Sequence, residues 1–575
     1  MHSWRPASLA LWLLMGLLGA RAAPAASPAP VAAENGMVVT AQAYATRIGV
    51  DVLKRGGNAI DAAVAVGYAL AVVYPAAGNL GGGGFMTVQF ADGRRTFIDF
   101  REKAPLAATA NMYLDPQGNV VPNLSTRGHL AVAVPGTVAG LEYIRGKYGT
   151  LPRGTLIDPA IRLAERGFVL AQGDVDILGE GTDDFRNDPA TAAIFLDAGQ
   201  PWRVGATLKQ PDLARALKHV RKSGAAGFYR GPTAEKLVAA SRAGGGILTQ
   251  ADLDAYDVRE LAPLECDYRG FHIVSAPPPS SGGIVICEIL NVLEGYPLAE
   301  YGWGSSRAVH VQIEAMRQAY IDRNQLLGDQ RFVKNPAELI LSKAYAAHIR
   351  AGIDPNHAGV SSQLAPGAGF REGNHTTHYS IADRFGNAVA VTYTLNDWFG
   401  ARVTAGGTGV LLNNEMDDFT SKVGVPNLYG LVQGENNKIE PGKRPLSSMA
   451  PTIVTRDDKP WMIVGTPGGS RIITAVTLTV LNVIDYGMDL QEAVDAPRIH
   501  QQWLPDETYV EARALSADTR AILERMGHKL TVPQPENHVA AILIGAPALN
   551  AQPVGANKFY GAIDPRRNTG LALGY

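Results

Sequence analysis

Cysteine is nearly missing from this chain, whose 575 residues include only Cys266 and Cys287. Two cysteines are too few for a fold that depends on several disulfides. They can form one bridge or remain two buried thiols, and we expect the thiols because free cysteine is among the most buried residue types. The sequence also lacks Cys-x-x-Cys, His-Glu-x-x-His and any other cluster at metal-ligand spacing. We therefore predict no metal site.

An excess of charge of either sign is absent as well. The chain has 52 Lys+Arg against 54 Asp+Glu, a formal net charge of −2. This balance does not favour nucleic acid as a partner. The hydrophobic fraction of 46% and the charged fraction of 18% are typical of globular proteins, which excludes a wholly disordered chain. Length alone suggests roughly three or four domains.

Apolar runs long enough to cross a membrane are lacking too. The run Leu9–Leu18 follows Arg5 and precedes Ala20-Arg21-Ala22, the order of charged, apolar and small residues found in signal peptides. We therefore predict a signal peptide over residues 1–22 and a periplasmic or secreted protein without a stable membrane anchor. An uncleaved N-terminal anchor is the alternative. A second run, Ala62–Tyr74, is rich in alanine and predicts a buried helix.

Glycine is plentiful and falls in clusters. The segment 41–73 predicts a helix, a glycine turn and a second helix, and it is followed by Gly81–Gly84. Strand-like residues follow these four glycines, and no Gly-Lys-Ser/Thr is present, so they do not form a phosphate-binding loop. Amphipathic helices dominate residues 130–360, with Ser306–Asn324 and Asn335–Arg350 as examples.

A second glycine cluster, Gly465–Ser470, lies between a buried strand at Trp461–Val464 and a helix that begins near Arg471. A turn of this kind presents unpaired backbone N–H groups and the positive end of a helix dipole. It can therefore stabilise an anion or an oxyanion. An ordinary strand-to-helix turn is the alternative.

Two strands joined by a short turn are predicted after residue 375. Thr376–Ala382 and Ala388–Leu395 alternate like strands, and 383–387 reads as the turn. If the turn is centred on Phe385, Thr394 lies directly across from Thr376. Their Cβ atoms would then be about 5 Å apart.

Seven segments in order along the chain resemble the γ-glutamyltranspeptidases, including their cephalosporin-acylase relatives. These segments are Gly56–Ala63, Gly81–Phe85, Phe100–Glu102, Thr376–Ser380, Asn413–Phe419, Arg444–Met449 and Pro467–Arg471. The resemblance implies an α+β fold, the four-layer αββα sandwich of N-terminal-nucleophile hydrolases. It also implies a precursor that cuts itself at the bond between His375 and Thr376. The large part, 23–375, and the small part, 376–575, would then share one core.

The chemistry that this resemblance implies needs no cofactor. A threonine hydroxyl is a poor nucleophile and requires a base within hydrogen-bonding distance. Once Thr376 is a chain terminus, its own α-amine, with an ordinary pKa of roughly 7.7–8.0, can be that base. Thr376 would attack the γ-glutamyl amide of glutathione or a related compound and form an acyl-enzyme. Water, an amino acid or a dipeptide would then accept the γ-glutamyl group.

The resemblance also assigns residues to the reacting bond. Gly468 and Gly469 would supply the N–H groups of the oxyanion hole. Thr394 would hydrogen-bond Thr376, which agrees with the register expected for the two strands. Tyr429 lies where the family has a lid loop over the pocket.

A γ-glutamyl group carries an α-carboxylate and an α-ammonium, so its pocket needs both signs of charge. The resemblance assigns Arg101, Ser447 and Ser448 to the carboxylate and Asp418, Glu415 and Asn396 to the ammonium.

Two departures from the family pattern leave substrate preference open. Glu415 stands where we expect glutamine, and Asp397-Trp398 stand where smaller hydroxylated residues are common. A bulky Trp398 could reshape the pocket. An acylase for glutaryl-type side chains, with the same fold and mechanism, is therefore the alternative. A non-catalytic exported solute-binding protein is a third reading.

Overall fold

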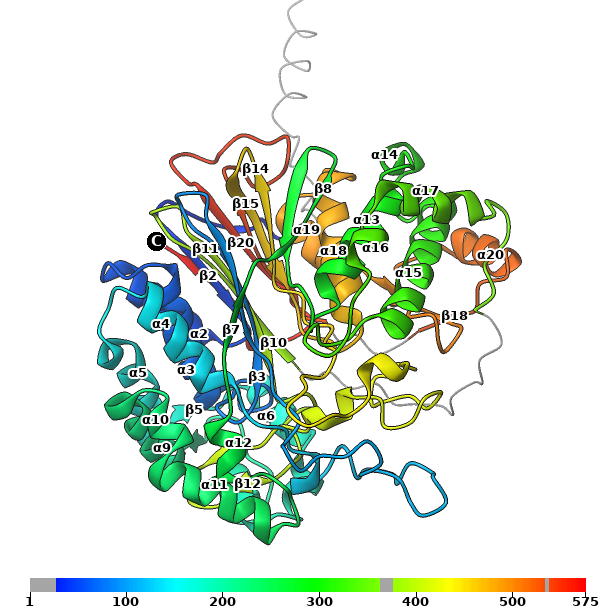
Figure 1. Ribbon diagram of the computed structural model, residues 1–575. Coiled ribbons are helices and arrows are strands. Elements are labelled where there is room, and N and C mark those ends of the chain that lie inside the picture. Colours follow the sequence, from blue (N-terminus) through cyan, green and yellow to red (C-terminus); the bar gives the residue numbers. More distant parts are fainter. Residues whose placement is uncertain (1–26, 362–375, 533–536) are drawn as a thin grey trace, which may run out of the picture.

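The computed structural model describes residues 27–361, 376–532 and 537–575. Two seven-stranded sheets lie face to face, and helices cover the outer face of each (Figure 1). This is the αββα sandwich predicted from the sequence. The predicted signal peptide and His375 lie outside the described residues.

The first sheet has the strand order β1 (Val31–Ala33), β20 (Phe559–Ile563), β19 (Ala540–Ile544), β15 (Lys459–Gly465), β14 (Thr452–Arg456), β9 (Phe271–Ser275) and β8 (Leu264–Tyr268). The second sheet has the order β21 (Leu571–Gly574), β2 (Met37–Thr40), β10 (Thr376–Ala382), β11 (Ala388–Thr394), β3 (Gly83–Gln89), β4 (Arg95–Phe100) and β7 (Arg259–Leu261). Every pairing within these two sheets is antiparallel.

Helices on the side of the second sheet are α2 (Ala43–Lys54), α3 (Ala59–Val73), α4 (Thr137–Tyr148), α5 (Arg153–Arg166), α9 (Pro211–Ser223), α10 (Ala226–Tyr229) and α11 (Gly231–Ala243). Helices on the side of the first sheet are α13 (Gly282–Leu293), α15 (Ser306–Leu326), α16 (Ala337–Ile340), α17 (Lys343–Gly352), α18 (Arg471–Ile484), α19 (Leu490–Asp495) and α20 (Ala517–Arg525). Among the residues that the structure describes, no helix combines the length and the apolarity that a membrane span requires.

Smaller elements connect these layers. They are the helices α6 (Gln172–Gly179), α7 (Thr182–Phe185), α8 (Pro189–Phe195), α12 (Gln250–Asp254) and α14 (Leu298–Tyr301), the short strands β5 (Phe168–Val169), β6 (Thr207–Leu208), β12 (Thr404–Ala405), β13 (Val410–Leu411), β16 (Ile499–His500), β17 (Thr508–Val510) and β18 (Leu530–Thr531), and the 3-10 turns η1 (His129–Ala131), η2 (Glu415–Asp418) and η3 (Glu435–Asn437).

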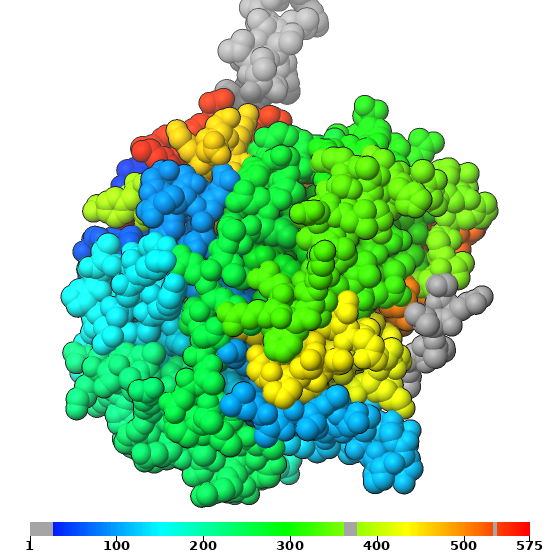
Figure 2. Space-filling view, in the orientation of Figure 1, coloured from blue at the N-terminus to red at the C-terminus, as the bar shows by residue number. Residues whose placement is uncertain are grey.

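The core between the sheets combines residues from distant parts of the chain. Val39 and Ala390 of the second sheet pack with Ile453, Ile463 and Ile542 of the first. Both sheets contain strands from before and after residue 376. In Figure 2 the yellow surface around residue 430 likewise lies between green and blue surfaces that precede residue 376. This interleaving does not fit the several separate domains that length suggested.

Helix α3 is buried along its whole length, as its alanine-rich sequence predicts. Asn58 and Asp61 close its N-terminus with a capping box, which satisfies backbone donors that have no partner within the helix. The predicted helix over Asn335–Arg350 is instead two helices, α16 and α17. The side chain of Ser342 caps the second one by accepting a hydrogen bond from Tyr345 N at 3.1 Å.

The four glycines Gly81–Gly84, which lead into β3 and form its first two residues, are explained by close packing. A Cβ on Gly82 would lie 1.9 Å from the Thr394 carbonyl oxygen, and one on Gly84 would lie 2.5 Å from that of Thr392. Side chains at these positions would push β3 away from β11. The glycine tract therefore sets the position of the end of β11, where Thr394 lies.

The expectation of two free thiols is wrong, because Cys266 of β8 and Cys287 of α13 form a disulfide. The two residues are 21 apart in the sequence. Spacing alone could not decide the pairing, because it depends on how α13 packs against the sheet edge.

We expect the double variant Cys266→Ser/Cys287→Ser to lose about 3 kcal/mol of unfolding free energy, because opening a loop of this size restores chain entropy to the unfolded state. Urea unfolding followed by circular dichroism measures the change. A reducing agent should destabilise the native protein and leave the double variant unaffected. Equal unfolding midpoints for both proteins would contradict the prediction.

Candidate active site

The two threonines predicted to face each other do so. Thr376 is the first residue of β10, Thr394 is the last of β11, and the strand register pairs them. Their hydroxyl oxygens are 3.3 Å apart, and the exposed fractions of the two residues are 4% and 2%. Asn396 N donates a hydrogen bond to Thr394 Oγ1 at 2.8 Å. The hydroxyl of Thr376 is therefore held in a buried, polar position.

A small pocket opens beside Thr376. It is lined by Arg101, Arg323, Thr376, Thr394, Asn396, Glu415, Asp418, Tyr429, Leu431, Ser447, Ser448, Met449, Gly469 and Ile472. Every site residue predicted from the sequence is on this lining except Gly468, which adjoins Gly469, and His375. The sequence reasoning missed Arg323, Leu431 and Ile472, which lie outside the motifs, and Met449, which ends the motif Arg444–Met449 but was given no role.

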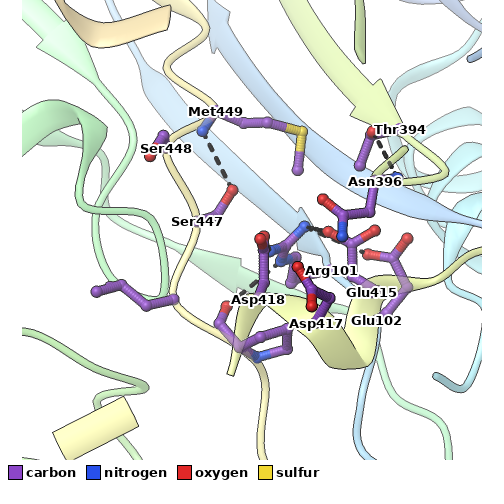
Figure 3. A network of polar contacts seen from close by, with 12 residues as sticks. Arg101, Glu102, Thr394, Asn396, Glu415, Asp417, Asp418, Ser447, Ser448 and Met449 are labelled. Atoms are coloured by element: carbon purple, nitrogen blue, oxygen red, sulfur yellow. Dashed lines mark hydrogen bonds and ion pairs between the residues drawn. The ribbon is translucent and has the colours of Figure 1, made fainter. Parts of the chain in front are cut away.

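Opposite charges meet at one side of the pocket. The buried guanidinium of Arg101 forms ion pairs with Glu415 and Asp418 and lies 3.8 Å from Glu102. Figure 3 shows these side chains together, with Ser447 and Ser448 on a neighbouring segment. Arg101 was predicted to bind the substrate's carboxylate, and Glu415 and Asp418 were predicted to bind its ammonium. In this structure the three side chains bind one another.

Burial governs the protonation of this cluster. Burial alone would lower the pKa of Arg101, but the carboxylates of Glu415, Asp418 and Glu102 raise it above the usual value, so the guanidinium stays charged. Burial raises the pKa of Glu102 to about 7 and that of Glu415 well above its usual range, with Arg101 opposing both shifts. Burial thus favours the neutral form of these carboxyl groups, while the Arg101 guanidinium favours their ionised form.

The serine pair is held by the loop that precedes α13. Ser447 O accepts hydrogen bonds from Ser281 N at 2.8 Å and from Ser281 Oγ at 2.7 Å. Met449 N donates to Ser447 Oγ at 3.1 Å, and Arg323 Nη2 donates to Ser448 Oγ at 3.1 Å. The hydroxyl oxygens of Ser447 and Ser448 thus each accept a hydrogen bond from another protein group.

The turn between β15 and α18 depends on glycine. Gly468 and Gly469 have φ values of +129° and +53°, which L side chains rarely adopt. A Cβ on Gly469 would also lie 2.3 Å from the ring of Tyr429. Within the described residues, the N–H groups of Gly468 and Gly469 donate no hydrogen bond. The turn can therefore offer two donors to a negative charge.

Tyr429 covers the pocket, and its exposed fraction is 5%. Its hydroxyl donates to Asn396 O at 2.8 Å, and its own carbonyl accepts from Gln502 Nε2 at 3.0 Å. Behind it, the Asp417 carboxylate accepts hydrogen bonds from Leu428 N at 2.9 Å and from Ser125 Oγ at 2.7 Å. Hydrogen bonds therefore hold both the side chain and the backbone of Tyr429 in place.

Trp398 does not line this pocket. It belongs to the hydrophobic core on the side of the second sheet, and the guanidinium of Arg567 stacks 4.0 Å from its ring centroid. The suggestion that Trp398 reshapes the pocket directly therefore has no support in the described structure.

Comparisons with known proteins agree with this arrangement. A family model described as Gamma-glutamyltranspeptidase matches residues 45–574. The chain is 69% identical to a glutathione hydrolase proenzyme of Pseudomonas sp. (strain A14), covering 96% of each chain, and 48% identical to that of Escherichia coli (strain K12), covering 99% of each. A crystal structure of cephalosporin acylase from Bacillus halodurans superposes with a TM-score of 0.81 at 28% identity, covering 97% of this chain and 99% of that one.

We expect Asp417→Ala to loosen the segment that carries Tyr429, because Leu428 N–H then loses its acceptor at a cost of about 1–3 kcal/mol. Hydrogen exchange of residues 420–432 should accelerate. Asp417→Asn retains an acceptor for Leu428 and is the matched control. Equal exchange in the wild type and both variants would contradict the prediction.

Proposed function

Because the chain belongs to the γ-glutamyltranspeptidase family, we propose a role for each pocket residue in its reaction. The protein is a self-processing γ-glutamyl hydrolase/transferase, an enzyme whose nucleophile is an N-terminal threonine. One observation carries the assignment of roles: a single buried pocket holds a threonine hydroxyl at a strand end together with paired charges of both signs.

Thr376 is the proposed nucleophile, and the bond before it is the proposed cleavage site. Its hydroxyl oxygen attacks the preceding carbonyl carbon, the peptide C–N bond breaks, and the proton goes to the freed amine. Water then hydrolyses the resulting ester. The products are residues 23–375 and 376–575, which remain together because each sheet contains strands from both parts. The freed α-amine becomes the base for later turnovers.

The charged cluster is the proposed binding site for the γ-glutamyl head group. Its α-carboxylate contacts Arg101, Ser447 and Ser448, and its α-ammonium contacts Asp418, Glu415 and Asn396. When the substrate binds, the ion pairs between Arg101 and the acids Glu415 and Asp418 are exchanged for new ones. Arg101 then pairs with the substrate's carboxylate, and the acids pair with its ammonium. Such exchange limits the loss of favourable electrostatic energy when the substrate binds.

The carbonyl of the scissile amide is then directed at Thr376. Attack by the threonine oxygen places negative charge on the carbonyl oxygen, and the N–H groups of Gly468 and Gly469 stabilise it. Thr394 holds the attacking hydroxyl at 3.3 Å. Tyr429, buried over the pocket, excludes water from one side of the acyl-enzyme.

Resolution of the acyl-enzyme completes the reaction. Glutathione and related γ-glutamyl compounds are the proposed donors, and water, amino acids and dipeptides are the proposed acceptors. Ping-pong kinetics follow from the covalent intermediate.

We also propose that the protein is exported to the periplasm or secreted without a stable membrane anchor, on the basis of the signal-like residues 1–22.

A glutaryl acylase remains the second candidate, supported by the likeness to a cephalosporin acylase. A glutaryl group has the carboxylate of a γ-glutamyl group and lacks its ammonium. The acidic side chains around Arg101 would then have no cation to bind, which favours γ-glutamyl donors. Relatives over the full chain are enzymes, so the reading as a non-catalytic binding protein has no support.

We expect Thr376→Ala to remain one uncut polypeptide without γ-glutamyl-p-nitroanilide activity, because alanine has no attacking oxygen. Denaturing electrophoresis and mass spectrometry of the small part's N-terminus measure the outcome, and the wild type should begin at Thr376. Thr376→Ser retains a hydroxyl and should still cleave. Normal cleavage in Thr376→Ala would sink the assignment of the nucleophile.

We expect Gly469→Ala to lower turnover by about 100-fold or more, because the added methyl group displaces the turn that binds the oxyanion. Steady-state kinetics on γ-glutamyl-p-nitroanilide measure the loss. Gly487 also has a positive φ, +65°, and a Cβ added there would meet no heavy atom within 4 Å. Gly487→Ala therefore controls for backbone strain and should keep normal turnover; a similar loss in both variants would argue against the oxyanion role.

A further inference from the structure

Arg323 is a buried cation that lines the pocket and has no assigned role. It projects from α15, and only 1% of its surface is exposed. Its guanidinium donates hydrogen bonds to Ser281 Oγ at 3.3 Å, to Asn324 Oδ1 at 2.7 Å, to Gln433 Oε1 at 3.1 Å and to Ser448 Oγ at 3.1 Å. All four acceptors are uncharged.

Arg323 therefore lacks the partner that a buried charge usually has. Within the described residues, no carboxylate lies within ion-pair distance of its guanidinium, and the nearby carboxylate of Asp418 is bound to Arg101. Burial lowers the pKa of Arg323 to about 10; Tyr320 and the Asp418 carboxylate oppose this shift, and Arg101 adds a smaller lowering effect. Arginine remains protonated at neutral pH even so, which leaves a positive charge without a direct ion pair among the described residues at this side of the pocket.

The contact with Ser448 has a direct chemical consequence. Because the Ser448 oxygen accepts a hydrogen bond from Arg323, the hydroxyl hydrogen of Ser448 must point in another direction. Ser447 is in the same position, because its oxygen accepts the N–H of Met449. Within the part of the chain that the structure describes, neither serine hydroxyl donates a hydrogen bond. The hydroxyl groups of Ser447 and Ser448 can therefore donate hydrogen bonds into the pocket, and the positive charge of Arg323 lies on the same side. An anion bound there would meet two donors and a cation.

We propose that Arg323 is a positioning residue for the substrate's α-carboxylate: it fixes Ser448 as a hydrogen-bond donor and supplies positive charge that the carboxylate neutralises. The inference rests on the proposed function and extends it, because it makes recognition of the carboxylate separable from recognition of the ammonium. Arg323 acts through Ser448 and does not form the reacting bond. The positive charge of Arg101, by contrast, is already matched by Glu415 and Asp418.

Three p-nitroanilide substrates separate the two charges. The γ-glutamyl compound has both, the glutaryl compound has only the carboxylate, and the 4-aminobutyryl compound has only the ammonium. We expect Arg323→Gln to lower kcat/KM for the first two by about 10- to 100-fold, the range for loss of a hydrogen bond to a charged group. The 4-aminobutyryl compound should change by less than about threefold.

Asp418→Asn should give the opposite pattern, with losses on the γ-glutamyl and 4-aminobutyryl compounds only. Arg317→Gln is the matched control, because Arg317 is also buried on α15 but pairs with Glu314 and Asp506 outside the pocket. It should preserve the ratios among the three substrates. These ratios do not depend on how much of each variant matures, so partial misfolding cannot imitate the effect.

An equal loss on all three substrates in Arg323→Gln would overturn the proposal and leave Arg323 as a structural cross-link. If this variant does not mature, Ser448→Ala tests the same contact and should lower kcat/KM selectively for the two carboxylate-bearing substrates. Absence of that selectivity would also overturn the proposal. Failure of the wild type to cleave the γ-glutamyl compound would instead contradict the proposed function itself.

Discussion

The antiparallel pairing of β10 and β11 is the constraint on which the site depends. Both strands are buried along their whole length at the centre of the second sheet. Their register brings Thr376 and Thr394 into contact at one end. A slip of one residue would turn every side chain of a strand to the opposite face, and the packed layers on both sides forbid it. The register of the sheet therefore determines the geometry of the proposed nucleophile.

Electrostatics around this strand end follow from the exclusion of water. Arg101 holds Glu415 and Asp418, while Arg323 faces only neutral acceptors. Water would screen such charges, whereas burial makes each unmatched charge costly. A zwitterionic head group has one charge of each sign and fits both halves of this environment. A cluster built in this way selects ligands by charge pattern as well as by shape.

Close backbone approach is the other requirement of the site. Gly82 lets β3 approach Thr394, and Gly469 lets the turn before α18 approach Tyr429. Any larger residue at either position would separate elements that must touch. The glycine clusters thus mark places where two segments far apart in the sequence come within contact distance.

Local patterns in the sequence were sufficient to predict the paired strands, the buried helix α3 and the glycine turn before α18, because alternation, composition and turn residues act over a few positions. The ordered motifs indicated the family and most residues of the pocket. Tertiary structure alone decided the Cys266–Cys287 disulfide, the burial of Trp398 away from the pocket and the contact between Arg323 and Ser448. These features depend on how α13, α15 and the second sheet pack, and a buried arginine on a helix has no local signal that reveals its partner.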